Sequence, residues 1–181
     1  MAPAERFVDA LNQQITNEFA ASQQYVAIAI YYESHTLPQL AAFFYLQAVE
    51  ERNHAMMMCQ YLLDTSSEVR IEGVPAPKSE FADFIAPIRL ALEQEKSVSG
   101  QISNVFSLAR DEKDYLSEQF MQWFLKEQVE EEATMGDLLE VAERVSDDPM
   151  TLEEFIAREH PRGDEGDPTA PTTAGGATSL E

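Results

Sequence analysis

Apolar residues recur along most of the chain in alternating steps of three and four, a spacing that gathers side chains on one face of an α-helix. This pattern predicts four long helices at about residues 3–33, 38–63, 87–110 and 114–145, and a short helix at about 152–160. Glycine is scarce, at 7 of 181 residues, and the prolines cluster outside the periodic segments. The sequence therefore predicts an all-α fold.

The lengths of the connections predict how these helices are arranged. Residues 34–36 form so short a turn that the first two helices must lie antiparallel. Residues 64–86 contain glycine and prolines but no helical period. A crossover of this length is an expected way to join parallel neighbours in a four-helix bundle. Thr151 and Glu154 form a capping-box pattern, which predicts that the short fifth helix begins there.

The composition divides the chain into a folded domain and a tail. Residues 1–160 carry all the predicted helices and are long enough to bury a sizeable core, so they predict a single domain. After Pro161 the sequence consists mainly of Pro, Gly, Thr and Ala with acidic residues. Because such a segment cannot bury enough apolar surface to fold, we expect residues 161–181 to form a disordered acidic tail.

Carboxylates interrupt the apolar stripe near the middle of every long helix. Glu51 and His54 are three residues apart and share one helix face, whereas Glu93 falls on the outer face of its helix. An antiparallel bundle would bring the inward carboxylates into one layer, where protons or cations must relieve their repulsion. Oxygen ligands with one imidazole suit iron, manganese or zinc. The inward carboxylates are Glu18, Glu51, Glu95, Glu127 and Glu131.

The formal net charge of −21 argues against nucleic acid as a partner, because phosphate contacts need clustered Lys and Arg. It suits cations, although solubility alone also explains it. Cys59 is the single cysteine, so a disulfide framework is excluded and a reducing compartment is expected. No segment has the pattern of a signal peptide or of a membrane span, and we expect a cytoplasmic protein that does not bind membranes.

Four elements of the sequence together resemble the signature of prokaryotic non-haem ferritins, in particular the actinobacterial type with a C-terminal extension. The resemblance covers about residues 5–160 and implies a ferritin-like four-helix bundle. Glu130 stands where a second His would complete another Glu-x-x-His pair, which argues against a centre of the bacterioferritin or ribonucleotide-reductase type. The elements are the segment Glu18 to Tyr25, Glu51-x-x-His54, Glu95, and Trp123-Phe124-x-x-Glu127-Gln128-x-x-Glu131.

The resemblance implies a role for each of these residues. A first iron ion would be bound by Glu18, Glu51 and His54, with Glu51 bridging to a second. The second would be held by Glu51, Glu95 and Glu131, with Gln128 as an adjustable ligand or hydrogen-bond partner. Tyr25 would be a one-electron donor or simply a core tyrosine. Trp123 would likewise be either a redox-active residue or a core residue. A third, looser site facing a mineral cavity would consist of Glu50, Glu127 and Glu130.

The implied function is storage and detoxification of iron. The protein would be a ferroxidase that oxidises Fe(II) with dioxygen or peroxide and deposits a ferric oxyhydroxide core inside a shell of twenty-four subunits. Haem is not expected, because Arg52 follows Glu51 at the position where bacterioferritins carry their Met ligand. Packing is the expected role of the nearby run Met56-Met57-Met58.

Three other functions compete with this interpretation. A metal-free helical bundle would have only a structural or interaction role, and a DNA-protecting miniferritin would have twelve subunits and no fifth helix. A di-iron oxygenase would act on an organic substrate. The role of the tail, the physiological oxidant, the reductase that releases iron, the entry channel and the balance between storage and detoxification stay open.

Overall fold

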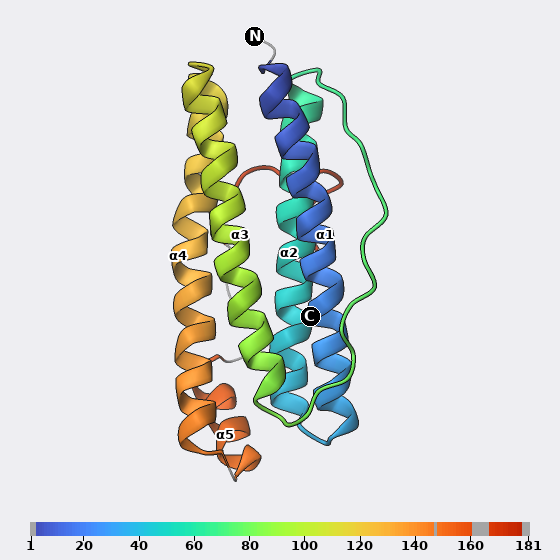
Figure 1. Cartoon of the computed structure of the whole chain (residues 1–181), viewed down its shortest axis with the longest axis vertical. Helices are drawn as coiled ribbons and strands as arrows, with labels where there is room; N and C mark the ends of the chain where they lie inside the picture. The colour runs from blue at the N-terminus through green and yellow to red at the C-terminus, as the bar shows by residue number, and fades with distance from the viewer. Residues whose placement is uncertain (1–2, 147, 161–166, 179–181) are drawn as a thin grey trace.

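The computed structural model describes residues 3–146, 148–160 and 167–178, which contain five helices and no strand. Four long helices lie side by side, and the short fifth helix closes one end of the bundle (Figure 1). This arrangement confirms the predicted all-α bundle with one long crossover. The helices are α1 (Glu5–Ser34), α2 (Pro38–Asp64), α3 (Ala86–Asp111), α4 (Tyr115–Arg144) and α5 (Pro149–Glu159).

The predicted start of the last helix was wrong. Helix α5 begins at Pro149 because the Asp148 side chain accepts hydrogen bonds from two backbone N–H groups of its first turn, at 3.1 and 3.4 Å. The expected capping box does not form, because the Thr151 hydroxyl donates to Asp148 at 2.7 Å. Aspartate satisfies the free N–H groups of a helix start as well as threonine does, so both residues fit this position in the sequence.

The long helices form two antiparallel hairpins. Helix α1 packs mainly on α2 and α3 mainly on α4, and the two hairpins approach each other along α1 and α3. A tight turn joins α1 to α2, with Thr36 in the left-handed region at φ 60°. The crossover 65–85 runs along the outside of α1 for the length of the bundle and brings α3 parallel to α2 (Figure 1).

Three polar side chains of α1 hold the crossover in place through hydrogen bonds to its backbone. They are distributed along the whole helix, so the crossover is fixed near both ends and in the middle. Each bond satisfies a carbonyl oxygen in a segment that has no regular secondary structure of its own. The bonds run from Asn12 to Glu68 (2.9 Å), from Gln24 to Lys78 (2.8 Å) and from Tyr32 to Phe84 (2.7 Å).

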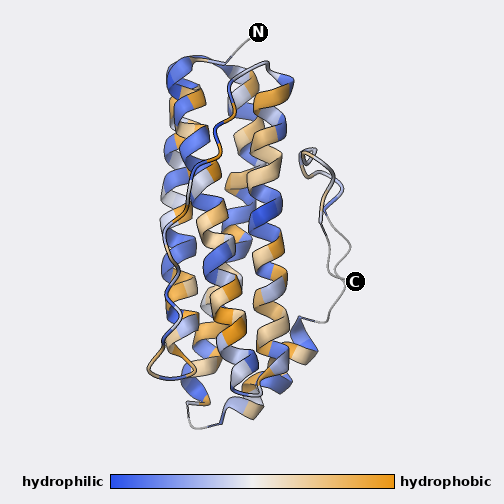
Figure 2. Ribbon diagram, turned by 90° about the vertical axis from the view of Figure 1, so that its right-hand side faces the viewer, coloured by the Kyte–Doolittle hydropathy of each residue, from blue (hydrophilic) through white to orange (hydrophobic). Residues whose placement is uncertain are grey.

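Two separate apolar clusters fill the bundle. The cluster nearer α5 contains Tyr25, Tyr32 and Phe44, all fully buried. The other cluster contains Met57 and Met58, which fits the expected packing role of the methionine run. Hydrophilic segments interrupt the apolar ones along the helices between the two ends (Figure 2). The core is thus divided by a polar layer at mid-length.

Helix α5 is attached to the bundle by a buried carboxylate. Glu153 is 5% exposed, and its two oxygens accept hydrogen bonds from the backbone N–H groups of Gln39 (2.9 Å) and Leu40 (2.7 Å) in the first turn of α2. The N-terminus of a helix favours negative charge, so Glu153 caps α2 from another element. Among the described residues, no helix is long and apolar enough to cross a membrane.

Candidate metal centre

The polar layer between the two apolar clusters contains one carboxylate from each long helix. The exposed fractions are 1% for Glu18, 2% for Glu51, 0% for Glu95 and 5% for Glu131. Their inward position follows from the helix phase, as the sequence pattern predicts, and Glu93 lies on the exposed face of α3. Burying a charged carboxylate without a partner costs free energy of folding. Four acidic groups in the middle of a bundle core therefore indicate that protons or a bound cation offset their charge.

Two neighbouring helices supply a compact group of metal-binding atoms. One ligand atom each from Glu18 on α1 and from Glu51 and His54 on α2 lie within 4.8 Å of one another. The His54 Nδ1 atom is 3.4 Å from Glu51 Oε2, as the i, i+3 spacing requires. The structure therefore brings together the three residues that the resemblance assigned to a first metal ion.

The other two helices supply the second half of the layer. Glu95 on α3 accepts a short hydrogen bond from the Tyr25 hydroxyl and one from Gln128 Nε2 at 3.0 Å. Gln128 is itself buried on α4, one turn before Glu131. The predicted inward face of α4 was wrong at this point. Glu127 was expected to face the core, but it is only half-buried, and the neighbouring Gln128 is buried instead.

Burial and repulsion between neighbouring charges raise the pKa values of three of these carboxylates, Glu51, Glu95 and Glu131. Burial, together with the charge of Glu95, raises the pKa of Glu51 well above its usual range. Burial raises the pKa of Glu95 to about 7, and burial followed by repulsion from Glu50 and Glu95 raises the pKa of Glu131. Burial also raises the pKa of Tyr25. Near neutral pH the layer therefore favours either protons or cations over bare charge.

A second group lies beside the first and shares its histidine. One ligand atom each from Glu50, His54 and Glu127 lie within 4.8 Å of one another. This group differs from the expected third site in one member, because Glu130 is not part of it. The Glu130 side chain is 61% exposed and forms an ion pair with Lys126 at 3.5 Å.

Two buried glutamines next to the carboxylates were not assigned to the site from the sequence. Gln14 Nε2 donates to Glu18 Oε1 at 2.8 Å, and Gln47 Nε2 donates to Glu50 Oε2 at 2.9 Å. Each stands on the same helix face as its partner, at a distance of four and three residues respectively. That spacing was the available signal, since an amide on a buried acidic stripe is well placed to hydrogen-bond the carboxylate.

Residues 167–178 of the predicted disordered tail lie against α2 and α4, whereas 161–166 and 179–181 are outside the described residues. This segment follows the side of the bundle in Figure 2. Asp167 accepts a hydrogen bond from Trp123 Nε1 at 3.1 Å and lies 3.5 Å from Lys126 Nζ. Asn53 forms two hydrogen bonds with the backbone of Thr178, at 2.9 and 3.0 Å. The segment thus covers part of the helix pair that carries the second group.

The residues present fit a divalent cation. The Glu18 Oε2 atom is buried and, among the described residues, accepts no hydrogen bond, although the Glu18 side chain belongs to an acidic group with Glu51. A cation bound there would satisfy this oxygen and offset the repulsion within the layer. Carboxylates with one imidazole are a donor set suited to first-row transition metals.

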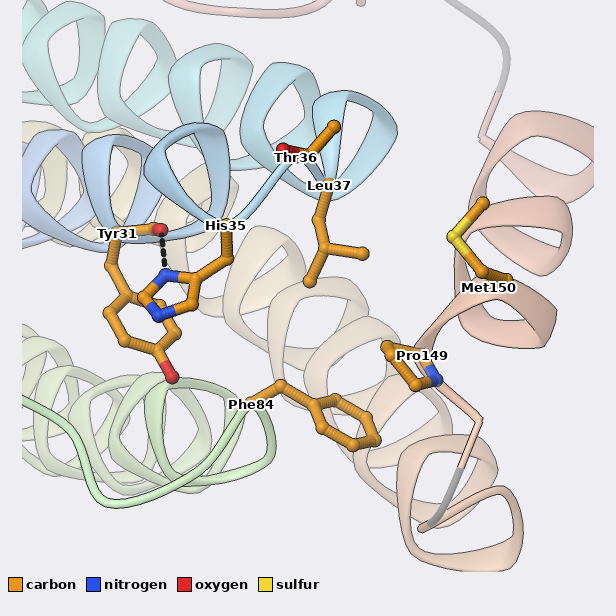
Figure 3. A pocket seen from close by; sticks show the side chains of 7 residues that line it. All are labelled: Tyr31, His35, Thr36, Leu37, Phe84, Pro149 and Met150. Atoms are coloured by element: carbon orange, nitrogen blue, oxygen red, sulfur yellow. Dashed lines mark hydrogen bonds between the residues drawn. The ribbon is translucent and has the colours of Figure 1, made fainter.

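Three surface pockets, of 480, 540 and 270 Å³, are lined by none of these carboxylates. The first lies at the end of the bundle, where the turn between α1 and α2 faces the start of α5 (Figure 3). There the His35 ring bonds back to the Tyr31 carbonyl oxygen at 2.7 Å. An organic substrate in any of these pockets would not lie against the acidic layer.

Each comparison of this chain with known proteins finds similarity to ferritins. The model of the family described as a ferritin-like domain matches residues 8–145. Ferritin BfrB of Mycolicibacterium smegmatis is 52% identical over 172 residues, which cover 95% of this chain and 94% of that protein. The bacterial non-heme ferritin of Staphylococcus saprophyticus is 36% identical over 148 residues, which cover 82% and 89% respectively.

A solved structure shows the same likeness in three dimensions. The open pore ferritin of the hyperthermophilic archaeon Archaeoglobus fulgidus superimposes with a TM-score of 0.83 at 30% sequence identity. The match covers 87% of this chain and 98% of the archaeal one, so it includes nearly all of the described bundle.

Proposed function

The chain belongs to the ferritin family, as a prokaryotic non-haem ferritin that stores iron, and on that premise we propose that it is also a ferroxidase. It oxidises Fe(II) with dioxygen or peroxide and deposits the product as a ferric mineral. The observation that carries the proposal is the buried group of Glu18, Glu51 and His54, whose ligand atoms lie within 4.8 Å of one another. This group belongs to a layer with two further buried carboxylates, which gives room for a pair of ions.

The same carboxylates determine how substrate iron binds. In the metal-free protein, burial raises the pKa values of Glu51, Glu95 and Glu131, so these groups hold protons more strongly than exposed carboxylates do. A ligand must be deprotonated to coordinate, so each Fe(II) that enters displaces protons. Anionic oxygen ligands then favour the more highly charged Fe(III) over Fe(II) by simple Coulomb attraction. Iron bound in this layer is therefore easier to oxidise than iron in water.

The second group, of Glu50, His54 and Glu127, is a binding site to which oxidised iron can move when it leaves the layer. His54 is common to both groups, and Glu50 and Glu127 are less buried than Glu18 and Glu51. Iron that moves from the first group to the second thus moves from a closed site to a more open one. We assign Glu127 and Glu50 to this outer site and keep Glu130 as an exposed carboxylate beside it.

Mineral storage requires a container, so we propose that the chain assembles into a shell of twenty-four copies. Membership of the ferritin family supports assembly into a shell, and the number twenty-four is what the resemblance of the sequence to non-haem ferritins implies. A di-iron oxygenase is less well supported, because none of the three pockets described above, formed by described residues, is lined by the carboxylates of the acidic layer.

Size and chemistry measured on one sample test this proposal. Size-exclusion chromatography with light scattering should give a mass near twenty-four times that of the chain. After aerobic addition of Fe(II), iron absorbance should elute with the protein at many ions per subunit. A monomer or dimer with about two ions per chain would support the oxygenase instead, and a dodecamer would support the miniferritin.

The double substitution Glu51→Ala with His54→Ala tests the centre itself. We expect a strong loss of the rate of oxygen-dependent Fe(II) oxidation with an unchanged shell mass, because two of three ligands of the first ion are removed. Glu93→Ala is the matched control, since Glu93 is exposed on α3. Oxidation at the wild-type rate in the double variant would refute the ferroxidase assignment.

A further inference from the structure

A chain of side-chain amides leads from α3 to the carboxylate of Glu18. Gln14 is 1% exposed and donates from Nε2 to Glu18 Oε1 at 2.8 Å, one helical turn further along α1. Asn17 Nδ2 donates both to Gln14 Oε1 at 3.2 Å and to Gln101 Oε1 at 3.0 Å. The chain crosses from α3 to α1 at the seam between the two hairpins.

The partners along this chain determine which end of each amide faces which neighbour. The Glu18 carboxylate accepts hydrogen bonds, so the Gln14 nitrogen must face it and Gln14 Oε1 is left as the acceptor for the Asn17 nitrogen. Asn17 Oδ1 then accepts from Gln13 Nε2 at 3.1 Å. Gln14 is held in the one orientation that offers a donor to the carboxylate.

We propose that Gln14 is a positioning residue that holds Glu18 Oε1 and leaves Oε2 as the oxygen that binds Fe(II), an inference that rests on the proposed function. Glu18 Oε2 is buried and accepts no hydrogen bond from any described residue. With Oε1 engaged, the carboxylate cannot rotate about its last torsion without breaking the bond to Gln14. The free oxygen is therefore kept available to the group in which Glu18, Glu51 and His54 each contribute one ligand atom.

A neutral donor has a particular advantage at this position. An amide fixes the direction of the carboxylate without competing for the cation, because a hydrogen-bonded N–H is not a metal ligand. A Lys or Arg donor would neutralise Glu18 and weaken its attraction for the cation. Residues that hydrogen-bond a metal ligand typically change metal affinity by roughly 10–100-fold when they are removed.

The experiment measures anaerobic binding of Co²⁺ to the assembled protein by equilibrium dialysis and by its visible absorption spectrum. Gln14→Met keeps the length of the side chain and removes the amide. Asn17→Asp, at a partly exposed position, replaces the donor that orients Gln14 with an acceptor, so it provides a second variant that does not alter a buried position. Gln119→Met on the exposed face of α4 is the matched control.

We expect Gln14→Met to bind one of the Co²⁺ ions roughly 10-fold more weakly or worse, with a changed absorption band for that ion. Asn17→Asp should weaken the same ion in the same direction, and Gln119→Met should match wild type. Shell mass and melting temperature in chelator, measured in parallel, separate this effect from a loss of folding.

Unchanged Co²⁺ affinity and spectrum in both Gln14→Met and Asn17→Asp would overturn the inference while leaving the ferroxidase proposal intact. A loss of melting temperature without a change in Co²⁺ binding would overturn it as well, because Gln14 would then act only in packing. Failure of the wild-type protein to bind Co²⁺ and to oxidise Fe(II) would instead refute the proposed function.

Discussion

Replacing Glu95 by glutamine should make the metal-free protein more stable at alkaline pH and leave it unchanged at acidic pH. Glu95 is fully buried, and burial raises its pKa from the usual 4.5 to about 7. Glutamine has the same shape, keeps an oxygen that accepts from the Tyr25 hydroxyl, and cannot ionise. Its NH2 group replaces the oxygen that accepts from Gln128, so the Gln128 amide must turn to present Oε1 as the acceptor. The substitution therefore removes the cost of a buried charge with little change in packing.

The size and the sign of the effect follow from the two pKa values. Below pH 4.5 the carboxyl group is protonated in both the folded and the unfolded chain, so it contributes nothing to the pH dependence. Between 4.5 and about 7 only the unfolded chain loses the proton, and the folded state loses about 1.4 kcal/mol per pH unit. Above about pH 7 the full penalty is present, about 3 kcal/mol.

Unfolding of the metal-free protein in chelator measures this penalty. At about pH 8 we expect Glu95→Gln to melt roughly 5–10 °C higher than wild type, and at about pH 5 the two should nearly coincide. Glu93→Gln is the matched control, because Glu93 is exposed two residues away on the same helix. An equal gain at both pH values, or no gain at the higher one, would refute the argument that burial of a charge is the cause.

Three further predictions concern contacts around the bundle. Glu153→Ala should lower the free energy of unfolding by about 2 kcal/mol, because two backbone N–H groups of α2 lose their acceptor; a melting temperature equal to wild type would contradict this. Asp167→Ala should shift the emission of Trp123, the single tryptophan, to longer wavelength, because its indole N–H loses a protein partner; unchanged emission would argue against the contact. Tyr25→Phe removes a hydrogen bond that lowers the pKa of Glu95, so Co²⁺ binding should weaken several-fold at about pH 6.5 but little at about pH 8.5. Equal weakening at both pH values would exclude this cause.

The inward carboxylates were predictable from the sequence because a helix repeats its faces every three or four residues. Glu18, Glu51 and Glu95 each stand in phase with apolar neighbours that have no reason to face solvent, and all three are buried. The short turn before Pro38 and the long aperiodic segment after α2 likewise determined the order and direction of the helices.

The phase of α4 was harder to predict because its sequence supports two stripes. Steps of three and four connect Phe124 to Glu131 through either Glu127 or Gln128, and only packing against the other hairpin selects Gln128. Composition also failed to predict the position of residues 167–178. Their contacts depend on single polar groups such as Asp167, which meets Trp123 from 44 residues away and forms no periodic pattern.

The division of the acidic layer between the two hairpins has a consequence for folding kinetics. Glu18 and Glu51 belong to the hairpin α1–α2, whereas Glu95 and Glu131 belong to α3–α4, so each hairpin can form from contacts that are local in sequence. The pair Glu18 and Glu51 meets the pair Glu95 and Glu131 only when the hairpins dock, which places the repulsion between the two pairs in that late step. Docking should therefore be faster at acidic pH or with a divalent cation present.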